Sequence, residues 1–175
     1  AFIHLTSLHE LSFSSNLLRH LNVDMFIGLD NLRFLVLDKN KLTSIEFDTF
    51  RHMPNLRVLS LHDNLIETIE SFSFVSLVHL RSIDLGNNRI VEIAPDMFAG
   101  LVNLEEIFMN GNKLVSLNHD TFVGLEDTLT TLYLPENNLM YIEANAFEKL
   151  TQLSYIYLAS NRLKRIDRNT FAGVA

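Results

Sequence analysis

A 24-residue period runs through the whole chain and constrains its fold more than any other feature. Seven units begin at Leu residues that are 24 positions apart, with one step of 25: Leu8, Leu32, Leu56, Leu80, Leu104, Leu129 and Leu153. A period of 20 to 50 residues is typical of solenoids, in which each unit buries its apolar face against its neighbours. The sequence therefore predicts a single repeat array over residues 1–175, with a partial repeat at residues 1–7.

Three sets of positions recur inside each unit when the first Leu is counted as offset zero. Offsets three and five are always apolar, and offset eighteen is Phe in all seven units, from Phe26 to Phe171. Offset eight is always Asn: Asn16, Asn40, Asn64, Asn88, Asn112, Asn137 and Asn161. The Asn amide both donates and accepts hydrogen bonds. We therefore expect these residues to form a structural ladder that satisfies backbone groups between units.

The alternation at offsets two to six predicts a short strand with offsets three and five buried and offsets two, four and six exposed. Successive units must run in the same direction, so these strands are expected to form a parallel concave sheet. The Phe residues are expected to stack on the convex side as a continuous spine. Asp24, Asp48, Asp96 and Asp120 lie shortly before a Phe. They are expected to cap short helical turns, because Asp is a favoured N-cap residue.

The core pattern L-x-x-L-x-L-x-x-N-x-L, carried for example by residues 56–66 with Ile at its last position, resembles the leucine-rich repeat. The 24-residue length and the Phe are similar to a subfamily common in extracellular proteins, including Toll-type receptors, Slit-like and chaoptin-like proteins and secreted arthropod immune proteins. This resemblance implies an α/β solenoid: a right-handed coil with a parallel concave β-sheet and short 3₁₀ or helical turns or extended segments on the convex side. It also implies a protein-recognition module in host defence or cell adhesion, outside the cell or at its surface.

Composition and motifs exclude several classes of function. The 14 Lys and Arg residues against 21 Asp and Glu residues give a net charge of −7, which argues against nucleic acid as a partner. The chain lacks cysteine, and no apolar run reaches the ~18 residues of a membrane span, so no membrane contact is expected within this segment. No phosphate-binding Gly loop, H-E-x-x-H or G-x-S-x-G motif is present. We therefore expect no catalysis and no cofactor.

A metal site is not expected either. Asp38, His62, Asp63 and Asp84 should lie near one another across three strands, and carboxylates and imidazoles can bind divalent metals. Their spacing matches no metal-binding signature, however, and charged side chains commonly occupy an open sheet face.

The ends of the sequence favour a fragment of a longer protein. Residues 1–7 match the end of a preceding unit, and the chain stops two residues before the next expected Leu. Such uncapped ends would expose apolar residues such as Leu8 and Phe171 and would allow homo-association. The absence of cysteines and of N-x-S/T sequons also suits an alternative, an intracellular scaffold or assembly protein located in the cytoplasm.

The candidate binding residues are the variable, outward positions of the strands. Neighbouring strands lie ~4.8 Å apart, so Phe108, Tyr133 and Tyr157 at offset four should stand side by side, with Tyr155 close to them. A contiguous exposed aromatic patch is typical of a protein interface, and the partner is expected to be a protein ligand or co-receptor. The alternative is that these aromatic residues only pack against one another as ordinary strand residues.

Two further groups of residues are candidates for partner contacts. Phe34, Val36 and Val58 form a second apolar group toward the amino terminus, and Asp84 lies between it and the aromatic residues. The other group is a column at offset one: Arg33, Arg57 and Arg81. The column predicts either a charged rim that orients an acidic partner or a set of solvated charges.

Overall fold

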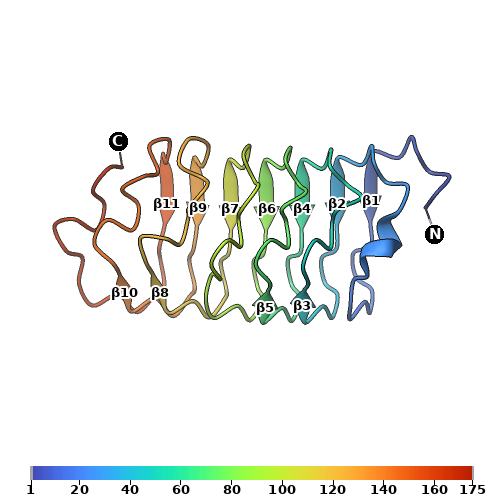
Figure 1. The fold of residues 1–175 in the computed structure, drawn as a ribbon. Coiled ribbons are helices and arrows are strands. Elements are labelled where there is room, and N and C mark those ends of the chain that lie inside the picture. Colours follow the sequence, from blue (N-terminus) through green and yellow to red (C-terminus); the bar gives the residue numbers. More distant parts are fainter. Residues whose placement is uncertain (1, 175) are drawn as a thin grey trace.

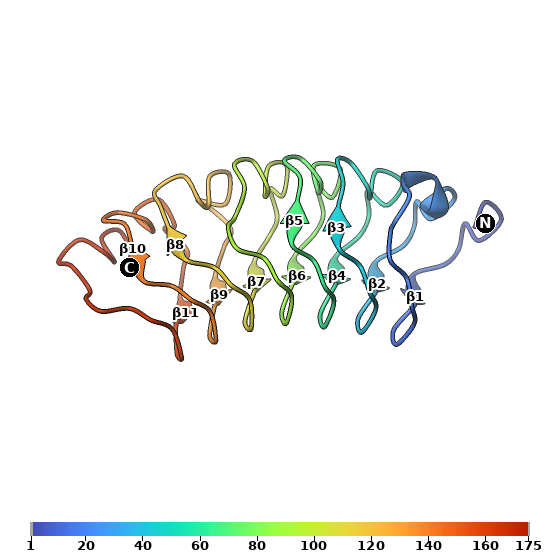
Figure 2. The same ribbon diagram turned by 90° about the horizontal axis from the view of Figure 1, so that it is seen from below.

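The computed structural model describes residues 2–174, which wind into an elongated coil with one turn per 24-residue unit (Figure 1). One strand from each unit joins a seven-stranded parallel sheet in the order β1-β2-β4-β6-β7-β9-β11. The strands are β1 (Glu10–Ser12), β2 (Phe34–Val36), β4 (Val58–Ser60), β6 (Ser82–Asp84), β7 (Glu106–Phe108), β9 (Thr131–Tyr133) and β11 (Tyr155–Tyr157). Viewed from below, the coil is an arc with this sheet on its inner side (Figure 2). The fold class expected from the repeat is confirmed.

The register of the sheet places equal offsets of successive units side by side. The middle residues of β2, β4 and β6 are Leu35, Leu59 and Ile83. Leu59 pairs with Leu35 on one side and with Ile83 on the other, and all three are fully buried. The residues on either side of them point outward, as the alternation predicts. Offsets two and four therefore form two rows along the concave face.

The extra residue near Thr128, which makes one step 25 residues long, leaves this register intact. Glu106 pairs with Thr131 and Phe108 pairs with Tyr133, so the longer loop absorbs the additional position. Inside the loop the Thr128 hydroxyl is buried and, within residues 2–174, has no hydrogen-bond partner. The insertion thus leaves one polar group unsatisfied while the sheet continues past it.

The convex side contains little regular structure, in agreement with the short turns and extended segments expected there. Two small parallel sheets pair β3 (Ser44–Ile45) with β5 (Thr68–Ile69) and β8 (Ser116–Leu117) with β10 (Tyr141–Ile142). The 3₁₀ helix η1 (Val23–Phe26) lies near the amino terminus. No helix in residues 2–174 combines the length and apolar character needed to cross a membrane.

The prediction that Asp residues cap the convex turns is wrong at all four positions; at Asp120, for example, the Asn118 side chain accepts the Asp120 N–H at 3.0 Å. The N-cap of η1 is Asn22, whose side chain accepts a hydrogen bond from the Asp24 N–H at 2.8 Å. Asp48 and Asp96 adopt positive φ angles of 49° and 57°. The tight turns of the coil need left-handed residues, and Asp tolerates that conformation better than most residues.

The convex side is interrupted in the unit that begins at Leu80. The rings of Phe26, Phe50 and Phe74 stack in sequence, as do those from Phe98 to Phe171, but no ring pair joins Phe74 to Phe98 in residues 2–174. The expected spine is therefore not continuous. The same unit has no convex strand in the described chain. Its convex half is therefore not held to its neighbours by β-sheet hydrogen bonds.

Pro95 removes one hydrogen bond between this unit and the following one. At the equivalent position of other units, Phe47 and His119 donate their backbone N–H to a carboxylate of the following unit. Proline has no N–H to donate. The backbone at Pro95 therefore lacks a connection that other units of the coil make.

The Asn at offset eight connects each unit to its neighbours. The Nδ2 of Asn88 donates to the carbonyl oxygens of Leu61, Leu85 and Gly86 at 3.0–3.1 Å, and its Oδ1 accepts the Ile66 N–H at 3.0 Å. The same set of contacts, three carbonyls and one N–H, recurs at five other positions: Asn40, Asn64, Asn112, Asn137 and Asn161. Asn16, in the first unit, donates only within its own unit.

A left-handed residue precedes each of these Asn residues. All seven have φ between 51° and 65°: Ser15, Lys39, Asp63, Asn87, Gly111, Glu136 and Ser160. This conformation ends the strand abruptly and turns the next side chain into the coil. Six of the seven residues carry a side chain, so the turn is imposed by the ladder hydrogen bonds and the core and does not depend on glycine.

Candidate functional site

The structure brings the three aromatic residues at offset four into one row on the concave face. Phe108 of β7 contacts Tyr133 of β9, with ring centroids 6.0 Å apart, and Tyr133 contacts Tyr157 of β11, with centroids 5.0 Å apart. Tyr155 lies two residues before Tyr157 on the same face of β11. We call these four residues the aromatic surface. They come from three adjacent strands, so their positions are fixed by the sheet register.

The aromatic surface combines packing with exposure. The ring pairs are tilted at 52° and 57°, a geometry in which the edge of one ring meets the face of the next. Tyr157 nevertheless remains 46% exposed and Tyr155 59% exposed. In the described chain, no hydrogen bond is made by the hydroxyl group of Tyr133, Tyr155 or Tyr157. Each phenol therefore presents an apolar ring and a polar group to the concave space.

The second apolar group lies on β2 and β4, toward the amino terminus. Phe34 and Val58 are register partners, Phe34 is 41% exposed, and Val36 and Val58 are half-buried. Asp84 of β6 lies between the two apolar regions, as a register partner of both Ser60 and Phe108. Along the coil the concave face thus has three successive regions: the second apolar group, a polar region and the aromatic surface.

The polar middle of the concave face is a hydrogen-bonded network. Asp38 accepts from the Ser60 hydroxyl at 2.6 Å and from the His62 N–H at 3.1 Å. Nδ1 of His62 lies 3.3 Å from Oδ1 of Asp84, which also accepts the Gly86 N–H at 2.8 Å. These carboxylates and the imidazole bond one another, and no group of three His, Cys, Asp or Glu residues in residues 2–174 is arranged to hold a metal ion.

Sequence reasoning placed these polar residues close together but missed the network. A Cβ atom at Gly86 would lie 2.7 Å from Nδ1 of His62 and 3.0 Å from Oδ1 of Asp84. The glycine at this position, just past the end of β6, therefore leaves space for the imidazole. A lone glycine at offset six, where other units have a side chain, was the available signal.

One carboxylate on the convex side has a clearly shifted pKa. Oε2 of Glu143 accepts hydrogen bonds from the side chain and the backbone N–H of His119, at 3.1 and 3.2 Å. These bonds favour the ionised carboxylate and lower the pKa of Glu143 below its ordinary value. The pair links two neighbouring convex turns on the side opposite the aromatic surface.

We expect the substitution His119→Ala to raise the pKa of Glu143 toward its ordinary value, because the side-chain hydrogen bond is the largest cause of the shift. Since the folded-state pKa is lowered, the pair stabilises the fold at pH values above the unfolded pKa. That contribution is lost as the pH falls through the folded pKa. A carboxylate titration of Glu143 by NMR measures the change, and an identical pKa in both proteins would contradict this assignment.

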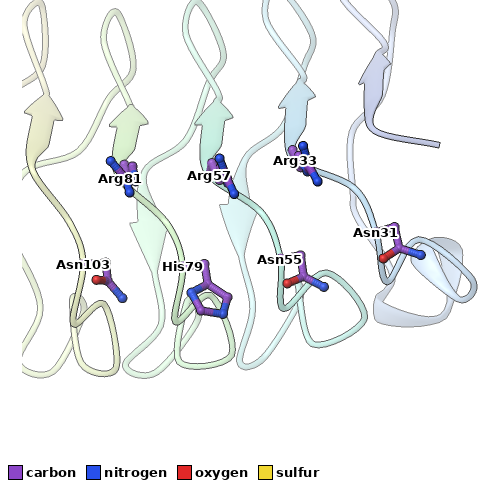
Figure 3. Close-up of a pocket in the computed structure, with 7 residues that line it drawn as sticks. All are labelled: Asn31, Arg33, Asn55, Arg57, His79, Arg81 and Asn103. Atoms are coloured by element: carbon purple, nitrogen blue, oxygen red, sulfur yellow. The ribbon is translucent and has the colours of Figure 1, made fainter. Parts of the chain in front are cut away.

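A cleft of about 240 Å³ lies at the edge of the sheet where the strands begin (Figure 3). Its two walls are rows of side chains from successive units. One row is Arg33, Arg57 and Arg81, and the other is Asn31, Asn55, His79 and Asn103. We call it the arginine cleft. Sequence reasoning found the arginine column but missed the second row, whose members each precede the first Leu of one of four successive units.

Comparison with known proteins places these features in context. The family described as "Leucine rich repeat" matches residues 1–42, 31–90, 78–128 and 127–175. The chain is similar to TLR13 in its complex with ssRNA13, with 32% identity and a TM-score of 0.91 over 96% of this chain and 24% of that one. It is also similar to Drosophila Toll in the Toll–Spatzle complex, with 26% identity and a TM-score of 0.73 over 91% and 25%. No curated protein matches. The chain spans about a quarter of the length of both similar structures.

Proposed function

Because this chain belongs to the leucine-rich repeat family, we propose that it is a recognition segment of an extracellular or cell-surface receptor and binds a protein partner on its concave face. The observation that carries the proposal is the aromatic surface. Its rings contact one another across three strands and remain partly exposed. The chain acts by binding and not by catalysis, which agrees with the receptor complexes formed by the two similar structures.

The composition of the aromatic surface suits a protein interface. Tyr is enriched among the residues that dominate binding energy, because its large, rigid ring carries a hydroxyl group. Clustering on a sheet fixes the rings before the partner arrives, which lowers the entropic cost of binding. The second apolar group, Phe34, Val36 and Val58, offers a further contact on the same face, with Asp84 in the polar region between them.

A protein suits this face better than nucleic acid, although one of the two similar structures is a complex with single-stranded RNA. The aromatic surface is bordered by Asp84, the register partner of Phe108, and by Glu106 on the same strand as Phe108. The whole chain carries a net charge of −7. Phosphate groups bind to clustered Lys and Arg, so carboxylates at this place disfavour an RNA backbone.

We expect the double substitution Tyr133→Ala and Tyr157→Ala to weaken binding of the protein partner by at least about tenfold, because interface tyrosines often contribute more than 1.4 kcal/mol each. The experiment immobilises the chain and compares proteins captured by the unmodified form, the double variant and Tyr141→Ala. Tyr141 is a matched control, since it is 45% exposed but lies on the convex strand β10.

A partner that is captured by the unmodified chain and by Tyr141→Ala, but not by the double variant, supports the proposal. Its affinity is then measured with the purified partner, before and after ribonuclease treatment. Equal binding by all three proteins would remove the aromatic surface from the interface. Loss of binding after ribonuclease treatment would show that RNA is the ligand. Melting temperatures of the three proteins separate a binding defect from unfolding.

A further inference from the structure

The arginine cleft holds three like charges at close spacing, and only one of them has an acidic partner. The N–H of Arg57 donates to the carbonyl of Arg33 and the N–H of Arg81 donates to that of Arg57, both at 2.8 Å, so the three residues are direct neighbours across parallel strands. The spacing of such strands is ~4.8 Å. All three side chains are exposed and line the same cleft (Figure 3). Side by side, three guanidinium groups repel one another unless an anion lies among them.

Two of these arginines have no acidic partner. Arg81 forms an ion pair with Glu105 at 3.3 Å, at the end of the column where the sign of the charge changes. Within residues 2–174, neither Arg33 nor Arg57 makes a salt bridge or a side-chain hydrogen bond. This contrasts with Arg51 and Arg89, which pair with Asp24 and Glu67 on other parts of the surface. The cleft therefore holds two unneutralised cations whose donors are available to a ligand.

The opposite wall supplies hydrogen-bond acceptors. Nδ2 of Asn31, Asn55 and Asn103 donates to a backbone carbonyl of the preceding unit at 2.7–2.8 Å, which fixes the orientation of each amide. In the described chain, the Oδ1 atoms of these amides accept no hydrogen bond. The amide row and the arginine row run along the same cleft, one beside the other (Figure 3). A ligand in the cleft thus meets cationic donors on one side and neutral acceptors on the other.

We propose that the arginine cleft is a second recognition site, which binds a short, carboxylate-rich peptide segment of a protein partner. Arg33 and Arg57 pair with carboxylates, for which the planar guanidinium is well suited. The Asn31 and Asn55 amide oxygens accept backbone N–H groups of the same segment. In an extended peptide, side chains two residues apart lie on one side and roughly 6.6 Å apart, within reach of neighbouring arginines.

A nucleic acid matches the cleft less well. Its sugar–phosphate backbone offers mostly acceptors, whereas the amide row requires donors. A long polyanion would also interact with the whole surface, whose net charge is −7. A short acidic segment confines its charge to the cleft. This inference does not depend on the aromatic surface, because the two sites lie on different parts of the coil.

The test uses the 175-residue chain and a short fluorescent peptide with Asp at alternate positions. We expect saturable binding by fluorescence anisotropy at low salt, with no binding of the peptide that has Asn in place of Asp. The double variant Arg33→Ala with Arg57→Ala should bind the Asp peptide at least about tenfold more weakly. The variant Tyr133→Ala with Tyr157→Ala should bind it normally, which separates this site from the proposed concave-face interface.

The matched control is Arg51→Ala with Arg89→Ala, which changes the net charge by the same amount outside the cleft. An equal loss of peptide binding in this control would show nonspecific attraction and would overturn the proposal. So would absence of peptide binding to the unmodified chain. Tighter, Arg33- and Arg57-dependent binding of inorganic phosphate or of a single-stranded RNA of equal charge would assign the cleft to phosphate in place of carboxylate. All four arginines are exposed, so melting temperatures should be unchanged.

Discussion

The substitution Phe50→Ala is expected to lower the free energy of unfolding by about 3–5 kcal/mol, the usual cost of truncating a buried Phe in a core. Phe50 is 1% exposed and stacks on Phe26 and Phe74, with ring centroids 6.1 and 5.8 Å away. Its removal leaves a cavity that both neighbouring units line. Because a repeat array is stabilised mainly by contacts between adjacent units, the loss should destabilise three units together. Chemical denaturation monitored by circular dichroism measures it.

Phe47→Ala provides the matched control, three residues away on the same convex turn. Phe47 is 62% exposed, so its truncation should change the free energy of unfolding by no more than about 0.5 kcal/mol. Similar destabilisation by the two substitutions would show that the Phe row does not form the convex core. The comparison therefore tests burial of the ring and not merely the presence of an aromatic residue.

The substitution Asn88→Ala is expected to lower the free energy of unfolding by about 1–3 kcal/mol, the usual penalty for leaving buried polar groups unpaired. It removes the donor to three carbonyls and the acceptor for the Ile66 N–H. Asn88→Asp should be no less damaging, because a carboxylate would place a negative oxygen against the carbonyls of Leu61 and Leu85. Thermal and denaturant unfolding of both variants measure these effects.

Asn110→Ala is the control for the ladder. Asn110 is half-buried at offset six of the adjacent unit, and its side chain makes no hydrogen bond within residues 2–174. Its truncation should have an effect of at most about 0.5 kcal/mol. If Asn88→Ala were equally harmless, the amide contacts would contribute nothing to the coil, and the ladder would be a consequence of the fold and not a cause.

The periodic residues could be predicted from the sequence because each unit provides the same surroundings. The residues equivalent to Leu59 and Asn88 meet similar neighbours in each turn after the first, so one unit explains the others. The aromatic row Phe108, Tyr133 and Tyr157 could be placed for the same reason, since equal offsets become register partners. The fold and the outline of the candidate binding face therefore followed from the period and the strand alternation.

The missed features depend on residues that break the period. Pro95 lacks the N–H that in other units donates to a carboxylate of the following unit, and the repeat pattern does not specify that hydrogen bond. The contact of His62 with Asp84 depends on the small residue Gly86 in a third unit. Contacts between residues of different units, such as these, could be recognised only in the structure. The positive φ of Asp48 recurs two residues before the Phe of other units, at Phe72, Asp96 and Asn145, so the turn is periodic but is not a helix start capped by Asp.

Side-chain footprinting tests most directly whether the concave face binds a protein partner. The chain is exposed to hydroxyl radicals alone and with its purified protein partner, and oxidation of each aromatic residue is compared by mass spectrometry. We expect protection of Tyr133, Tyr155 and Tyr157 in the complex, while Phe47 and Tyr141 on the convex side remain as reactive as before. Protection of the convex residues, with the three concave tyrosines still fully reactive, would contradict the claim.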